Sequence, residues 1–268
     1  MKWLYYPLAF LSAFFVYSYS TDASIIYASA TKHLDLAGQT EIAWKSLIEA
    51  ITLNLYEGAS EKIIEVQALQ EAAKVKMRYA TYCTIGFLFL TGAFLISQYL
   101  DVLKLKSKKN LIIHLIAVAM ICLVAGITTP MLNLVAFKEV PVLGTVIFKF
   151  ESKSIAGVIT KLFETKNFFI AVLILLFSII TPVVKSVLSL AVYMAKSVDI
   201  RMKALHIIKL IGKWSMTDVF VVSILLAFFS ISVDETTDAW LSHGLYFFAA
   251  YVILSLVIGH LLLMEKAE

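Results

Sequence analysis

The chain has 268 residues, of which 60% are hydrophobic and 16% charged, with a mean hydropathy of +0.87 and a formal net charge of +4. Soluble domains are roughly 45–50% apolar and about 25% charged, so this composition predicts an all-α polytopic membrane protein. The basic residues lie in short loops between apolar runs and form no face that could bind nucleic acid, so we exclude that function class.

The first apolar run covers residues 3–19 and follows Lys2. It is either a signal anchor or a cleavable signal peptide. Ser18-x-Ser20 is an acceptable cleavage site, but the run is long and rich in aromatic residues, which favours an uncleaved anchor. With either interpretation, the residues that follow are translocated.

Residues 22–78 form the only long polar segment. Gly58 interrupts its apolar periodicity, and Ser60 can cap a second helix that runs to Ala73. We expect a pair of amphipathic helices outside the membrane. The first of them carries its apolar residues at helical spacing, at Trp44, Leu47, Ile48, Ile51 and Leu55.

Five further apolar runs are long enough to cross the hydrocarbon core, which needs about 20 residues in a helix. With residues 3–19 they predict about six transmembrane helices. The five runs cover residues 79–100, 111–128, 168–195, 215–233 and 244–264.

The chain between the third and fourth predicted spans is mixed in character. Pro130 follows the third span and marks its end, because proline does not continue a regular helix. Residues 141–150 have an alternating side-chain pattern and include β-branched residues around Gly144, which predicts a small pair of strands outside the membrane. Residues 154–163 predict a short surface helix.

The charges of the short loops predict the orientation. Loops 101–110 and 196–213 are rich in lysine and arginine, whereas loop 234–243 contains acids and neither basic residue. Basic loops stay on the cytosolic side. Both termini are therefore expected in the cytosol, with segments 20–78 and 130–167 outside.

Lys185 and Asp218 are the charges most costly to place in a membrane, one in the fourth span and one at the start of the fifth. Ser215 can cap the fifth helix. We consider three interpretations: a structural Lys185–Asp218 pair, a polar cavity on the substrate path that includes Ser215, and a Lys185 side chain that snorkels to the interface.

Three other residues have positional meaning. Pro182 lies in the middle of the fourth span, where it either makes a packing kink or opens a groove towards lipid. Trp214 precedes the fifth span and is expected to anchor it at the headgroup level. Pro130 is interpreted as the end of a helix.

The sequence contains no Walker A, G-x-S-x-G, H-E-x-x-H or C-x-x-C motif. The five histidines share no metal-ligand spacing, and Cys83 and Cys122 lie inside apolar runs. We therefore expect no cofactor, no metal site and no enzymatic activity.

The most specific block is GKWSMTDVFV at residues 212–221, and it resembles the paraquat-inducible protein A family. The resemblance covers about residues 111–264 and divides the chain into an N-terminal transmembrane hairpin, 1–110, and a four-helix module, 111–268. Its other blocks are TTPM at 128–131, SIAGVI at 154–159, TPVVK at 181–185 and GLYF at 244–247.

The resemblance implies a multi-pass protein of the bacterial inner membrane. It implies transport of phospholipid or another hydrophobic molecule between that membrane and the periplasm or outer membrane, with membrane lipids and an MCE-domain periplasmic protein as partners. Larger members carry two modules and zinc ribbons, and this chain has one module and no C-x-x-C motif. The alternative is an envelope-stress or membrane-integrity protein that acts through protein contacts of segment 20–78.

Overall fold

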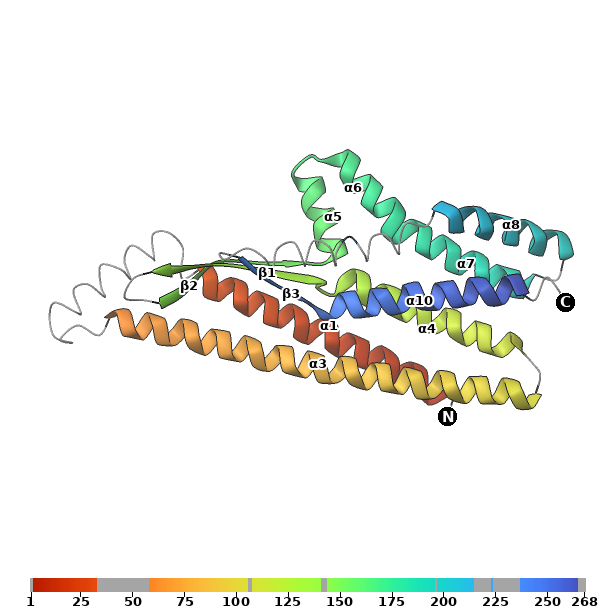
Figure 1. Cartoon of the computed structure of the whole chain (residues 1–268), viewed down its shortest axis with the longest axis horizontal. Helices are drawn as coiled ribbons and strands as arrows, with labels where there is room; N and C mark the ends of the chain where they lie inside the picture. The colour runs from red at the N-terminus through yellow and green to blue at the C-terminus, as the bar shows by residue number, and fades with distance from the viewer. Residues whose placement is uncertain are drawn as a thin grey trace.

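The computed structural model describes residues 2–32, 58–105, 108–140, 144–195, 197–214, 223 and 237–264. Its helices form an elongated bundle with a small sheet at one end (Figure 1). Both termini lie at the opposite end, together with helix α8 (Val198–Trp214). The predicted first helix of the polar segment, through Trp44 and Leu55, lies outside the described residues.

A long antiparallel hairpin, α1 (Lys2–Lys32) and α3 (Gly58–Leu105), runs the length of the molecule (Figure 1). Helix α1 continues beyond the predicted span 3–19. Helix α3 is uninterrupted from Gly58, so the predicted second polar helix and the predicted span 79–100 are one element, and Ser60 lies inside it. No proline and no glycine occurs from residue 59 to residue 85 to break it.

Aromatic and ionic contacts hold this hairpin together. The Tyr5 ring stacks on Phe94 with centroids 3.9 Å apart, and its hydroxyl lies 3.0 Å from Thr91 Oγ1. Nearer the sheet, Lys76 donates to Asp22 at 3.1 Å. The two helices are therefore joined both in the apolar middle and at their polar end.

Helices α4 (Lys108–Thr128) and α10 (His243–Met264) pack side by side against the hairpin. Gly126 permits the close approach, since a Cβ at this position would lie 2.8 Å from the Phe248 backbone nitrogen. One apolar core joins these helices to α1 and α3. It includes Tyr5, Ala9, Val16, Phe87, Phe94, Ile112, Leu115, Val118, Phe247, Phe248 and Tyr251.

The sheet has three antiparallel strands in the order β2-β1-β3: β1 (Leu132–Val140), β2 (Gly144–Lys153) and β3 (Thr237–Leu241). Strands β1 and β2 form the predicted pair, but β1 begins at Leu132, before the predicted segment 141–150, and the two strands are joined through residues 141–143 rather than around Gly144. Strand β3 was predicted as part of an acidic loop. It pairs with β1 in the register Asn133–Trp240.

The predicted surface helix is α5 (Ile155–Glu164), whose Ser154 hydroxyl accepts a hydrogen bond from the Gly157 amide at 3.1 Å. The predicted fourth span consists of α6 (Phe168–Leu175), the π-helical turn η1 (Leu176–Ile180) and α7 (Thr181–Met194). The π turn ends at Ile180, two residues before Pro182.

Helix α8 corrects the prediction that residues 196–213 are a simple loop. Its basic residues alternate with an apolar face, and Ala204, Leu205 and Ile208 are buried in the common core. Helix α8 contacts α7 and, less extensively, α10. The lysine-rich segment is therefore an amphipathic helix at the end of the bundle that holds the termini.

Four of the described helices are long and apolar enough to cross a membrane: Ala68–Leu100, Asn110–Thr128, Phe168–Met194 and His243–Leu262. These four correspond to the second, third, fourth and sixth predicted spans. Helix α1 is not among them, and the predicted fifth span lies outside the described residues apart from Ser223, so the count of six is not confirmed.

Candidate functional site

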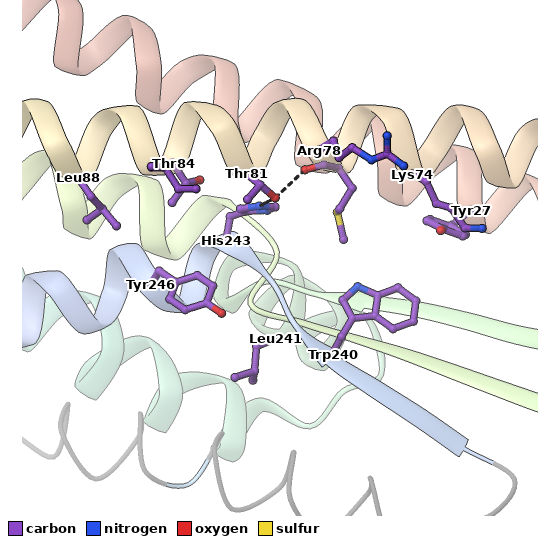
Figure 2. Close-up of a pocket in the computed structure, with 12 residues that line it drawn as sticks. Tyr27, Lys74, Arg78, Thr81, Thr84, Leu88, Trp240, Leu241, His243 and Tyr246 are labelled. Atoms are coloured by element: carbon purple, nitrogen blue, oxygen red, sulfur yellow. Dashed lines mark hydrogen bonds between the residues drawn. The ribbon is translucent and has the colours of Figure 1, made fainter.

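The candidate site is an open-sided pocket of about 690 Å³ between α3, β3 and the start of α10. Figure 2 shows that α3 supplies one wall, from Lys74 to Leu88. The other wall comes from β3 and α10, with Tyr27 of α1 at the sheet end. Its residues are Trp240, Leu241, His243 and Tyr246.

The wall on α3 changes from polar to apolar along the helix. Lys74 and Arg78 are four residues apart, Thr81 follows, and Ile85 and Leu88 complete one face at helical spacing. The cationic side chains lie at the sheet end of this face and the aliphatic ones towards the middle of the bundle. The pocket therefore offers two chemically different ends to one ligand.

Within the part of the chain that the structure describes, the cationic end is only partly neutralised. Lys74 donates to Glu71 at 2.7 Å, and both side chains are exposed, so this ion pair is weak and easily exchanged. Arg78 is also exposed at the mouth of the pocket. These three side chains together leave one net positive charge.

An aromatic cluster supports the sheet end of the pocket. The Tyr27 ring stacks on Phe150 with centroids 5.1 Å apart, and Trp240 lies 6.1 Å from both rings. Burial raises the pKa of the Tyr27 hydroxyl above its usual value, so it stays uncharged at neutral pH. This cluster attaches α1 to the sheet and fixes the position of the Trp240 wall.

His243 joins three helices beneath the pocket. Its Nδ1 lies 3.0 Å from Ser20 Oγ of α1, and its Nε2 lies 3.0 Å from Thr81 Oγ1 of α3. Thr81 donates its only hydroxyl proton to the Met77 carbonyl at 3.0 Å. Nε2–H therefore donates to Thr81, and Nδ1 accepts from the Ser20 hydroxyl.

The surroundings of this Ser–His contact indicate that it holds helices together. Ser20 is 1% exposed, and the group on the far side of the imidazole is the Thr81 hydroxyl, where a nucleophile–base system would place a carboxylate. The contact fixes α1, α3 and α10 relative to one another at the level of the pocket.

A shallow depression of about 750 Å³ continues along α3, and all the described residues that line it belong to this helix. It shares Leu88 with the pocket above and extends to Leu100, past the small residues Gly92 and Ala93. Together the two cavities make a path of one cationic end and a long apolar remainder. Such a surface suits an amphiphile with an anionic group at one end.

The structure places Lys185 half-buried on α7, where its carbonyl accepts from Ser189 Oγ at 2.8 Å. Ser215 and Asp218 lie outside the described residues, so the proposed Lys185–Asp218 pair stays a prediction. Trp214 is the last residue of α8.

Pro182 is buried near the N-terminus of α7, and its carbonyl accepts a hydrogen bond from the Tyr251 hydroxyl at 3.1 Å. Pro130 lies between the end of α4 at Thr128 and the start of β1. Neither proline nor Lys185 lines the α3–α10 pocket.

This pocket was not predicted from the sequence. Its available signal was the regular spacing of Lys74, Arg78, Thr81, Ile85 and Leu88 across the boundary of a predicted span. Among the residues that the structure describes, no three His, Cys, Asp or Glu side chains gather in a metal-binding arrangement.

Comparison with curated proteins gives no match, and comparison with solved structures gives none either. The family model for paraquat-inducible protein A matches residues 115–264, which is more than half of the chain. The matched region includes most of α4 and all of the sheet and α10, whereas α1 and α3 lie outside it. The chain belongs to the paraquat-inducible protein A family.

Proposed function

We propose that this protein takes part in moving phospholipid, or another hydrophobic molecule with an anionic group, between the bacterial inner membrane and the periplasm or outer membrane. The α3–α10 pocket is where the molecule binds. The observation that carries the proposal is the polarity of the α3 wall, with Lys74 and Arg78 at one end and an apolar path to Leu100 at the other.

The dimensions of the path support a lipid. At 1.5 Å per residue, Lys74 lies roughly 21 Å along α3 from Leu88 and about 39 Å from Leu100. The hydrocarbon core is about 30 Å thick. With residues 79–100 in that core, Lys74 and Arg78 lie at the headgroup level, where a lipid phosphate is found.

The charge at the mouth favours an anionic headgroup. A guanidinium can bind two phosphate oxygens at once, so Arg78 is the principal contact in this proposal. Lys74 contributes after exchange of its exposed ion pair with Glu71. Trp240 and Tyr246 line the same pocket, and both residue types are enriched at membrane interfaces.

The arrangement of the ends supports access from the periplasmic leaflet. The basic helix α8 and both termini are at one end of the bundle, and the sheet is towards the other (Figure 1). Strand β3 of this sheet lines the pocket. Because basic segments stay in the cytosol, we place the termini there and the sheet in the periplasm. An MCE-domain protein is the proposed periplasmic acceptor, and the proposed role involves no catalysis.

The test compares lipid retention by the full chain and by Arg78→Gln and Lys74→Gln variants. Each protein is purified from nanodiscs of phosphatidylglycerol and phosphatidylcholine, and native mass spectrometry counts the lipids that stay bound. We expect the double variant to lose its preference for phosphatidylglycerol by about tenfold, while Lys161→Gln on α5 keeps it. An unchanged preference in the double variant rejects this pocket as the headgroup site.

A second experiment separates transport from the alternative role in envelope integrity through protein contacts. The segment between α1 and α3, residues 33–57, is replaced by a glycine–serine linker, which leaves the packed hairpin in place. If the protein takes part in lipid transport, Arg78→Gln should impair envelope function, and the MCE-domain partner should still co-purify. Loss of envelope function in the linker variant alone, with normal lipid retention, favours the alternative.

A further inference from the structure

We infer a second lipid-binding groove on this protein, between α1 and α4, which holds one diacyl lipid through its ester and glycerol oxygens and is indifferent to headgroup charge. It is separate from the α3–α10 pocket and does not depend on transport through that pocket. Two adjoining cavities with different linings form the groove.

The lower cavity, which is the one farther from the sheet, has a volume of about 370 Å³ and is lined almost entirely by carbon. Phe10 and Phe14 of α1 face Met120 and Val124 of α4 across it. Phe10, Phe14 and Val124 are 66%, 54% and 55% exposed, so large apolar surface remains uncovered at the level of the candidate span Asn110–Thr128. An acyl chain is the ligand whose chemistry matches this surface.

The upper cavity, of about 440 Å³, has a different lining, rich in hydroxyl groups. Among the described residues, none of its lining side chains is charged. The hydroxyls come from α1, the end of α4, β2 and the cap of α5: Tyr17, Thr21, Ser24, Thr128, Ser152 and Ser154. Neutral donors and acceptors suit ester and glycerol oxygens rather than a phosphate charge.

The two cavities are continuous. Tyr17 and Thr128 line both, so the apolar lower half opens directly into the hydroxyl-rich upper half. Phe10 and Ser24 are 14 residues apart on α1, or roughly 21 Å along the helix. That length accommodates most of an acyl chain with the ester region above it, in the order in which a bilayer presents them.

Some of these hydroxyls are already used and others are available. Ser24 Oγ lies 2.9 Å from the Ser20 carbonyl and 3.0 Å from Ser152 Oγ. The Thr128 hydroxyl donates to the Val124 carbonyl at 2.8 Å. Tyr17 and Thr21 have no hydrogen-bond partner among the residues that the structure describes. These two lie where the ester group of a seated lipid would be.

One wall of the groove lies in the family-matched region and the other does not. Most of α4, from Leu115 to Thr128, falls within residues 115–264, and α1 lies outside them. The groove therefore exists because this chain adds α1 to the family module. Helix α1 is also the less apolar partner, and a bound acyl chain would complete its contact with the hydrocarbon phase.

The test uses the full chain in vesicles that contain a trace of phosphatidylcholine or phosphatidylglycerol with a diazirine in the acyl chain. After illumination, crosslinked peptides are identified by mass spectrometry. We expect crosslinks concentrated on α1 around Phe14 and on α4 around Val124, with equal yield for the two headgroups. Even labelling of all lipid-facing helices would overturn the proposal.

Two variants with a matched control sharpen the test. Val124→Trp fills the lower cavity from an already exposed position. It should reduce the lipid crosslinks on α1 and α4 about tenfold, because most of the apolar contact with the acyl chain is removed. Leu11→Trp, on the exposed surface of α1 outside the cavity lining, should leave them unchanged. Equal yields in both variants would reject the groove.

The hydroxyl half is tested with Tyr17→Phe combined with Thr21→Val. We expect the number of lipid crosslinks around Phe14 to fall several-fold. The decrease should be the same for phosphatidylcholine and phosphatidylglycerol. Arg78→Gln should leave these crosslinks intact. If Arg78→Gln does not change lipid retention but the lipid crosslinks on α1 and α4 are found, the proposed α3–α10 pocket is rejected and this groove is not. If Arg78→Gln changes lipid retention but these crosslinks are absent, the groove is rejected and the pocket is not.

Discussion

The imidazole of His243 and the hydroxyl of Thr81 lie 3.0 Å apart, although 162 residues separate them in the chain. The contact joins the first turn of α10, inside the family-matched region, to α3, which lies outside it. Ser20 completes the connection from α1. The floor of the pocket is thus a hydrogen-bonded junction of three helices.

This junction predicts a stability loss in Thr81→Val. The change removes the hydrogen bond between the Nε2–H of His243 and Thr81, and loss of such a bond costs about 0.5–1.5 kcal/mol. Thr160→Val on α5 removes an exposed hydroxyl that donates to the Ala156 carbonyl at 3.0 Å, and it should cost much less. Thermal unfolding in detergent compares the two, and equal midpoints would show that the junction contributes nothing.

Gly126→Ala should separate α4 from α10. A Cβ at residue 126 would lie 2.8 Å from the Phe248 backbone nitrogen, and a backbone cannot yield as a flexible side chain does. We expect a loss of about 1–3 kcal/mol from overpacking. Gly86→Ala on α3 is the control, since its Cβ meets nothing within 4 Å. That variant should be neutral or gain up to about 1 kcal/mol from helix propensity.

Tyr251→Phe tests the hydrogen bond to the Pro182 carbonyl, which links α10 to the second residue of α7, just after the π turn. Its removal should lower stability by about 0.5–1.5 kcal/mol. Tyr246→Phe, on an exposed position of the same helix, should leave the unfolding midpoint where it is. A larger loss at residue 246 than at residue 251 would contradict this role.

The Lys185–Asp218 pair is tested by charge exchange. Lys185→Asp and Asp218→Lys should each impair envelope function, because each leaves a charge in or near the membrane without its partner. The double exchange should restore most of it. Failure of the exchange to rescue either single change would rule out the pair and leave a polar cavity or a snorkelling lysine.

The orientation is tested by cysteine accessibility in a chain whose Cys83 and Cys122 are replaced by alanine. A cysteine at Ser107 should react with a membrane-impermeant maleimide only after the inner membrane is opened, and one at Thr236 should react in intact spheroplasts. The opposite pattern at either position would invert the proposed placement of the pocket mouth.

Local signals in the sequence predicted the local features of the fold. Ser154 before an apolar periodic run indicated α5, and Pro130 indicated the end of α4. The strand pair was expected in the right region, although its turn was displaced, because β-branched residues continue on both sides of residues 141–143. These features depend on side chains close together in the chain.

Features that depend on distant residues could not be predicted in this way. Strand β3 has five residues after an acidic run, and its partner β1 lies about a hundred residues earlier. The apolar residues of α8, such as Ala204 and Leu205, alternate with basic residues in the sequence. They form a buried face only because α8 packs against α7. The pocket has the same character, because its walls meet only when α3 and α10 are assembled.

The uninterrupted length of α3 has a mechanical consequence. Its 48 residues span roughly 72 Å at 1.5 Å per residue, whereas a bilayer with its headgroups is about 40–45 Å thick. A rod of this kind has no joint at the water boundary. Force applied by a periplasmic partner at its outer end would therefore tilt the buried part as well, and with it the wall that carries Arg78.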